Sequence, residues 1–180
     1  GKTVACVNDL IKSVMTCELN SPRVAYICPL LKQAKDTAWL YAKQYTANIP
    51  GRKVNETELS VTVYGDRRLR LYGADDPDSL RGIYLDAVVV DEFAQIRPRF
   101  LAEVLLPMLM DRHGKITIIG TPMGRNEFFE IYDDAVKGFW TDRESRTGAR
   151  VKNPEFRGWM FKASETKILP EFELEQYRNT

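Results

Sequence analysis

Three residues at the start of this 180-residue chain have the side chains needed to bind a phosphate. Gly1-Lys2-Thr3 is followed by a helical pattern, as at the end of a phosphate-binding loop. In such a loop the lysine reaches the β- and γ-phosphates and the threonine hydroxyl binds Mg²⁺. The complete signature has another glycine five residues earlier, which the chain does not include. Because Gly-Lys-Thr is frequent by chance, these residues alone do not decide the chemistry.

A second cluster is the acidic pair Asp91-Glu92, which directly follows three valines. Two carboxylates after a buried strand are costly unless a cation lies nearby. In a nucleotide hydrolase the first acid holds Mg²⁺ through water, and the second orients or deprotonates the attacking water. An acidic helix N-terminus before Pro98 explains the same pair equally well. This motif alone therefore leaves both interpretations open.

Hydrophobic patterns predict the elements that position these clusters. Strands are expected at 23–29, 87–93 and 116–122, with a hairpin over Leu59–Ala74 that turns at Gly65-Asp66. Helices are expected at about 3–18, 31–45, 98–112 and 126–136, the second burying Leu31, Ala34, Ala38, Ala42 and Tyr45. Residues 137–158 are expected to form a loop, followed by a strand near Trp159–Ala163 and a short helix from Pro170.

Apolar strands that alternate with helices predict an α/β fold with a mainly parallel sheet covered by helices. Ligands in such folds gather at the carboxyl ends of neighbouring strands. A third polar cluster, Gly120-Thr121, follows the next apolar strand after Asp91-Glu92. All three clusters should therefore meet at one edge of the sheet, with Thr121 beside Glu92. This order of motifs predicts a P-loop nucleotide hydrolase.

Composition and charge exclude several other classes of protein. The chain has no apolar run long enough to span a membrane. Its net charge of +1 gives no global field for nucleic acid, so any such binding must come from local patches. The three cysteines lack metal-ligand spacing and are expected to be reduced and buried. His113, the single histidine, suits a helix C-terminus and has no second histidine with which to form a metal site.

The chain resembles the ATPase domain of the large terminase subunit, the motor that packages DNA into the capsids of tailed bacteriophages. The stretches that carry the resemblance are GKT, RVAYICPLLKQAKDTAW, RLYGADDPDSLRGIYLDAVVVDEFAQIRP, ITIIGTPMGRNEFFEIY and FKASETKILPEFELEQY. The resemblance implies that Gly1, Lys2, Thr3 and Thr121 contact ATP, that Thr3 and Asp91 hold Mg²⁺, and that Glu92 is the catalytic carboxylate. Thr121 would belong to the coupling motif.

The resemblance also implies a catalytic role for Arg81, in SLRGIYLD. An arginine at this position acts as a finger that reaches the site of a neighbouring subunit, which is worth ~10³–10⁵ in rate. From the residues alone, a surface arginine paired with Asp75, Asp76 or Asp78 is the simpler interpretation.

The family implies double-stranded DNA, a portal protein, a small terminase subunit and a homo-oligomeric ring as partners, in the cytoplasm of the infected host. Residues 1–137 are expected to be an ATPase core whose first strand precedes Gly1, and residues 138–180 a lid or linker toward a nuclease domain. Two alternatives stay open. A DExx-type helicase shares these motifs but normally has a second RecA-like domain, and a nucleotide-dependent assembly module would not need Glu92.

Overall fold

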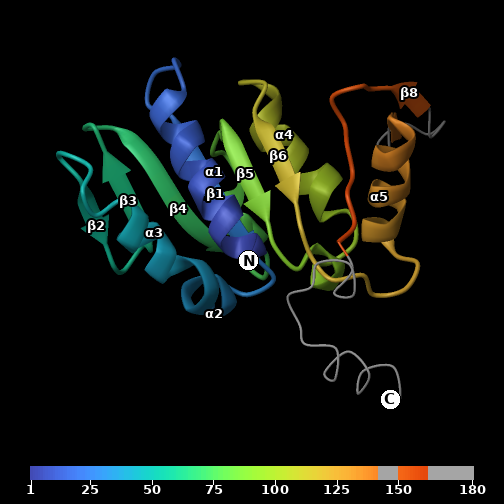
Figure 1. The fold of residues 1–180 in the computed structure, drawn as a ribbon, viewed down its shortest axis with the longest axis horizontal. Helices are drawn as coiled ribbons and strands as arrows, with labels where there is room; N and C mark the ends of the chain where they lie inside the picture. The colour runs from blue at the N-terminus through green and yellow to red at the C-terminus, as the bar shows by residue number, and fades with distance from the viewer. Residues whose placement is uncertain (142–149, 162–180) are drawn as a thin grey trace. The chain divides into compact units, whose positions relative to one another are not determined.

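The computed structural model describes residues 1–141 and 150–161. The chain divides into two compact units, residues 1–127 and 128–180. The first unit contains the three polar clusters and a six-stranded sheet in the order β2-β3-β4-β1-β5-β6 (Figure 1). Its strands are β1 (Arg23–Cys28), β2 (Lys53–Asn55), β3 (Ser60–Val63), β4 (Arg67–Gly73), β5 (Ala87–Val90) and β6 (Lys115–Ile118).

Four neighbouring strands, β4, β1, β5 and β6, run parallel. β3 forms the predicted antiparallel hairpin with β4, and β2 adds an antiparallel strand at the edge. This sheet confirms the predicted α/β fold with a mainly parallel sheet. Parallel order places the carboxyl ends of β1, β4, β5 and β6 on the same edge, so the residues that follow these strands are near one another.

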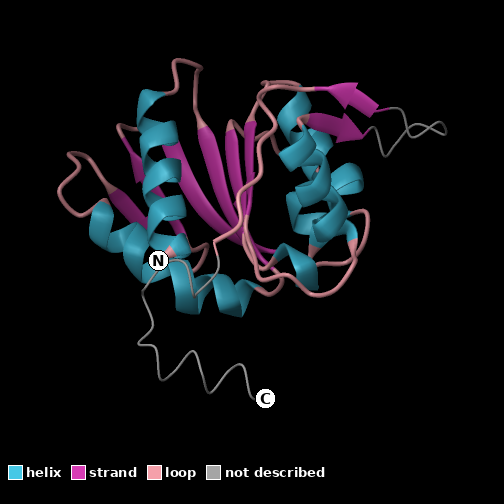
Figure 2. Ribbon diagram, turned by 45° about the vertical axis from the view of Figure 1, so that its right-hand side comes forward, coloured by secondary structure: helices cyan, strands magenta, loops and turns pink. Residues whose placement is uncertain are grey.

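Helices lie on both faces of the sheet, as Figures 1 and 2 show. Most helical segments are short and several are joined end to end. They are α1 (Lys2–Thr16), α2 (Leu31–Ala34), η1 (Lys35–Trp39), α3 (Leu40–Tyr45), η2 (Pro77–Leu80), η3 (Phe93–Gln95), η4 (Leu101–Leu105) and α4 (Leu106–Met110). The π-helical segments η1 and η4 continue directly into α3 and α4, so each pair forms one continuous helix.

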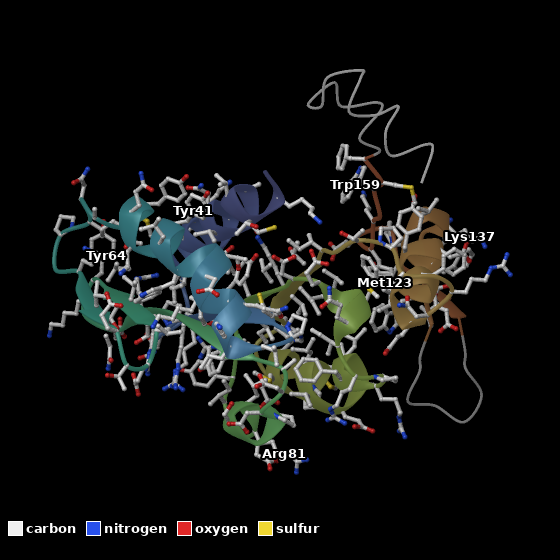
Figure 3. All side chains as sticks on the ribbon, turned by 90° about the horizontal axis from the view of Figure 1, so that it is seen from below. Tyr41, Tyr64, Arg81, Met123, Lys137 and Trp159 are labelled. Atoms are coloured by element: carbon white, nitrogen blue, oxygen red, sulfur yellow. The ribbon has the colours of Figure 1, made fainter. Side chains whose placement is uncertain are left out.

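One face of the sheet packs against α1 and the α2–η1–α3 helix. Val7, Leu10 and Val14 of α1 share a core with alternate residues of the parallel strands, among them Tyr26 and Val89. The residues between them, such as Ile27 and Val88, are buried on the opposite face. Seen from below, the helix of residues 100–110 lies on the other side of the sheet from α1–α3 (Figure 3). The central strands are therefore covered on both faces, which explains their continuous apolar sequence.

The second unit, as far as it is described, contains α5 (Glu127–Lys137, whose first residue belongs to the first unit), β7 (Phe139–Thr141) and β8 (Arg150–Lys152). β7 and β8 pair as an antiparallel ribbon. Gly158 lies close to α5, since a Cβ there would be 3.1 Å from the Cβ of Ala135.

Several predictions of secondary structure are wrong in detail. Residues 137–158 contain the β7–β8 ribbon rather than only a loop, and residues 159–161 are not in a strand. Leu31 and Tyr45 are exposed rather than buried, because the helix presents mainly its alanines and Trp39 to the sheet. The helix predicted from Pro170 lies outside the described residues.

Candidate nucleotide site

The start of α1 and the end of β5 bring Lys2 and Glu92 together. The Nζ atom of Lys2 lies 4.0 Å from Oε1 of Glu92. Gly1 is the N-cap of α1, and its carbonyl accepts the first helical hydrogen bond from Ala5. The N–H groups of Lys2, Thr3 and Val4, which precede Ala5, have no partner within the helix and point out of its positive end. The lysine and the helix N-terminus, both suited to a phosphate group, thus lie beside a carboxylate.

The carboxylate of Asp91 is buried and held by two hydrogen bonds, and its backbone is held by a third. Its Oδ2 atom accepts a hydrogen bond from the Tyr26 hydroxyl at 2.6 Å, and its Oδ1 atom accepts one from the Glu92 N–H at 2.9 Å. Its own N–H donates to the Ile27 carbonyl at 2.8 Å, which extends the β1–β5 ladder by one residue. Asp91 is 6% exposed. A carboxylate held in this way has little freedom to turn toward a different ligand.

Glu92 leaves the strand through a left-handed backbone conformation, with φ 49° and ψ 41°. For a residue with a Cβ this conformation costs of order 1–3 kcal/mol, and such strain is concentrated at functional sites. The turn breaks the alternation of the strand, so the Glu92 side chain does not pass to the opposite face of the sheet. Its Oε2 atom instead accepts a hydrogen bond from the Thr121 N–H at 3.4 Å.

Gly120 lets the loop after β6 approach the loop after β5. The Phe93 N–H donates to the Ile119 carbonyl at 3.2 Å. A Cβ on Gly120 would lie 3.2 Å from the Phe93 nitrogen and 3.4 Å from the Glu92 Cα. These atoms belong to the backbone and cannot turn away as a side chain can. The absence of a side chain at Gly120 therefore favours the close approach of the two loops that brings Thr121 to Glu92.

Arg81 lies apart from these residues, at the end of η2. Its side chain is 73% exposed, forms an ion pair of 3.1 Å with Asp78, and extends outward from the η2 segment (Figure 3). It borders a groove of about 740 Å³ along the carboxyl edge of the sheet. The groove is also lined by Gln33, Asp75, Gln95 and Arg97, the last two from the loop that follows Glu92. The structure thus does not bring Arg81 to Lys2 and Glu92 within one chain.

Burial and the charge of Asp91 together raise the pKa values of three groups near that carboxylate, Cys6, Tyr26 and Cys28. Burial raises the pKa of the Tyr26 phenol, and the hydrogen bond to Asp91 raises it further. Burial, followed by the charge of Asp91, raises the pKa of Cys6 to about 11 and that of Cys28 to about 12. At neutral pH these three groups keep their protons, and the two thiols are poor nucleophiles, as expected of packing residues. Cys17 is also a free thiol but is only partly buried, which corrects the prediction for that residue.

The donors present fit Mg²⁺ in a nucleotide site. Among the described residues, no group of three or more His, Cys, Asp or Glu side chains is placed to hold a metal ion. Mg²⁺ in phosphoryl-transfer sites does not need such a cage, since it takes one or two protein oxygens and the phosphates of the substrate. The hydroxyl of Thr3 and the carboxylate of Asp91 are oxygen donors of that kind, and both are near Tyr26.

The fold is that of an α/β domain with a mainly parallel sheet, and the polar clusters lie at its carboxyl edge. No protein-family model matches the chain. Two curated proteins, the large terminase subunits of Thermus virus P23-45 and Thermus phage G20c, are each 36% identical to it over 98 residues. The match covers 54% of this chain and 20% of each relative, so the chain spans about a fifth of the length of these relatives.

Solved structures of terminases share the fold. The ATPase domain of the large terminase of Thermus phage P74-26 has a TM-score of 0.67 and 23% identity, covering 98% of this chain and 82% of that domain. The large terminase of another thermophilic bacteriophage, solved with ATP-γ-S, has a TM-score of 0.68 and 16% identity, covering 99% of this chain and 41% of that protein. These comparisons confirm the resemblance to the large terminase subunit, and the fold is that of the terminase ATPase domain.

Tyr26 does not stand out in the sequence as a site residue, because it lies within an apolar strand, RVAYIC. A hydroxyl within an otherwise apolar strand was the available signal, because a buried phenol needs a hydrogen-bond partner.

The helices of the described residues are too short or too polar to cross a membrane.

Proposed function

We propose that the chain is the ATP-hydrolysing motor domain of a phage terminase large subunit, which drives double-stranded DNA into a procapsid. The observation that carries this proposal is the meeting of Lys2, at the start of α1, with Glu92 and Thr121, which follow the adjacent strands β5 and β6. The contacting atoms of Lys2 and Glu92 are 4.0 Å apart, and those of Glu92 and Thr121 are 3.4 Å apart. A cation for phosphate, a carboxylate for water and a backbone contact to the next strand are the parts that hydrolysis coupled to motion requires.

In this proposal the N-terminus of α1 and Lys2 bind the β- and γ-phosphates of ATP. Thr3 and Asp91 would hold Mg²⁺, which when bound would neutralise charge on the phosphates. Glu92 accepts a proton from the water that attacks the γ-phosphorus. The γ-phosphate also competes with Glu92 for the Lys2 ammonium group, so ATP binding would release the carboxylate for that task.

Thr121 would transmit the movement of the Glu92 carboxylate to β6 and to the chain beyond it. Its N–H holds Oε2 of Glu92, so any movement of that carboxylate alters the contact. Arg81 would serve as a finger for the site of the next subunit, since its exposed position does not reach Glu92 within one chain but is open to a neighbour. This role implies a homo-oligomeric ring.

The remaining assignments rest on the resemblance alone. Residues 1–137 would be the ATPase core and residues 138–180 a lid or linker toward a nuclease domain. The portal protein and the small terminase subunit would be the partners of the assembled motor. The protein would act in the cytoplasm of the infected host.

Phosphate release by the intact protein, measured with Mg²⁺ and ATP, tests this function. Hydrolysis that double-stranded DNA stimulates is expected. Stimulation by single-stranded DNA together with strand separation would instead indicate a helicase. Nucleotide binding without phosphate release would indicate an assembly module, and either of these results would overturn the proposal.

A further inference from the structure

The hydroxyl of Tyr26 bonds to one of the two side chains proposed to hold Mg²⁺ and lies near the other. Tyr26 is on β1, paired with Val89 of β5 and Leu71 of β4, and is fully buried. Val89 and Asp91 are two positions apart, so their side chains share the α1-facing side of the sheet with Tyr26. Register and alternation together therefore bring the phenol to the Asp91 carboxylate.

The Tyr26 hydroxyl has one proton, which it donates to Oδ2 of Asp91 at 2.6 Å. A bond of this length to an ionised carboxylate is charge-assisted and stronger than one between neutral groups. The Thr3 side chain also lies near the phenol, whose pKa it acts to lower. Because the phenol proton is already given to Asp91, the Thr3 hydroxyl can bond to Tyr26 only as the donor.

The single phenol proton points to Asp91 and holds one of its oxygens in a fixed orientation. A Thr3 hydroxyl that donates to Tyr26 keeps its lone pairs for a cation. A phenylalanine would keep the ring packed between α1 and the sheet and would lose the hydrogen bond to Asp91.

We infer that Tyr26 is a positioning residue for Mg²⁺, which orients the Thr3 hydroxyl and the Asp91 carboxylate as a pair. The inference rests on the proposed nucleotide site. It adds that the two ligands, which come from α1 and β5, are aligned by a third element, β1. Mutation of a group that orients metal ligands in this way typically lowers the metal affinity by 10–100-fold.

The test compares Tyr26→Phe with Tyr84→Phe in the intact protein. The Tyr84 hydroxyl donates to the Ser21 carbonyl at 2.9 Å, at the opposite ends of β1 and β5, so this control also loses one hydrogen bond. Binding of fluorescent ADP is titrated over a range of Mg²⁺ concentrations and again in EDTA. Tyr26→Phe should need about tenfold more Mg²⁺ to reach half of the Mg²⁺-dependent change in ADP binding. Its affinity for metal-free ADP should stay within about twofold, and Tyr84→Phe should match the wild type.

Equal Mg²⁺ dependence in folded Tyr26→Phe and wild-type protein would overturn the inference. If the wild type itself shows no Mg²⁺-dependent binding, the proposed function fails first. Incorporation of 3-fluorotyrosine at position 26 provides a second readout that keeps the fold. Its ¹⁹F signal should move when Mg²⁺ is added to the ADP complex, while the same label at position 84 should not respond. An unchanged signal at position 26 would also overturn the inference.

Discussion

The charged atoms of Lys2 and Glu92 lie 4.0 Å apart, although Lys2 begins the first helix and Glu92 lies in the turn after β5. Their side chains are 54% and 34% exposed. An ion pair with this exposure is worth only about 0–1 kcal/mol. The contact therefore contributes little to folding and is easily exchanged for a phosphate. A weak pair at the end of a strained turn is consistent with a site arranged for a ligand rather than for stability.

The proposed finger predicts rescue between subunits. Arg81→Ala should bind ATP normally but lose about 10³-fold or more in turnover in the assembled ring. Mixing it with Glu92→Gln subunits should restore part of the activity, because some interfaces then combine an intact Arg81 with an intact Glu92. Steady-state phosphate release over a range of mixing ratios measures this effect.

Arg99→Ala is the matched control for Arg81→Ala. Arg99 is 76% exposed and forms an ion pair of 3.3 Å with Glu103, so its replacement removes a similar surface interaction. This variant should leave turnover unchanged. An absence of rescue at every mixing ratio would show that Arg81 acts within its own chain or is only structural.

Gly120→Ala should impair catalysis more than folding. The new Cβ presses on the backbone of Glu92 and Phe93, and overpacking of this kind costs typically about 1–3 kcal/mol. Because the strain falls on the loop that carries Glu92, turnover per folded molecule should decrease at least about tenfold. Urea unfolding and phosphate release are measured on the same samples.

Gly114→Ala, at the other end of β6, provides the contrast. Its Cβ would lie 2.4 Å from the Leu85 carbonyl oxygen, so it should destabilise the domain more strongly. Its folded fraction should nevertheless turn over ATP at the wild-type rate. Wild-type turnover in Gly120→Ala would contradict the proposed contact between β6 and the catalytic loop.

The buried thiols predict a loss of stability in alkali. The pKa values of Cys6 and Cys28 are raised from 9.0 to about 11 and about 12, first of all by burial. Above about pH 9 the unfolded chain binds fewer protons than the folded one, so the free energy of unfolding falls as the pH rises toward these values. The slope is at most about 1.4 kcal/mol per pH unit for each thiol.

Urea unfolding at about pH 8 and about pH 10 measures this loss. A Cys6→Ala, Cys28→Ala double variant is the control and should lose less stability over the same interval. Unfolding free energies that are equal at the two pH values in the wild type would show that the thiols are not buried against Asp91 as described.

The parallel strands and α1 were predictable because their sequences carry strong local signals. The strands at Arg23–Cys28 and Ala87–Val90 are apolar runs that require burial on both faces, and α1 has one apolar face. β2 and the β7–β8 ribbon were not predictable. Each strand is only three residues long, and β2 is exposed on every residue, so it has no apolar pattern to detect.

The site was predictable only as far as its motifs. Lys2, Thr3, Asp91 and Glu92 stand out by type and spacing, and parallel topology brings them together. The left-handed backbone of Glu92 and the Tyr26–Asp91 hydrogen bond did not follow from the sequence. Both depend on the register between β1 and β5, which is set by packing over the whole sheet and leaves no local signal.

The role of Glu92 is tested most directly by steady-state ATP hydrolysis in the Glu92→Gln variant of the intact protein. Glutamine keeps the shape of the side chain but cannot take a proton from water. Turnover should fall by at least about 10²-fold, while ATP affinity stays within a few-fold of the wild type. Glu103→Gln, which removes an exposed carboxylate paired with Arg97 and Arg99, should hydrolyse ATP normally. Turnover in Glu92→Gln within a few-fold of the wild type would contradict the account, because the carboxylate beside Lys2 would then not be the catalytic base.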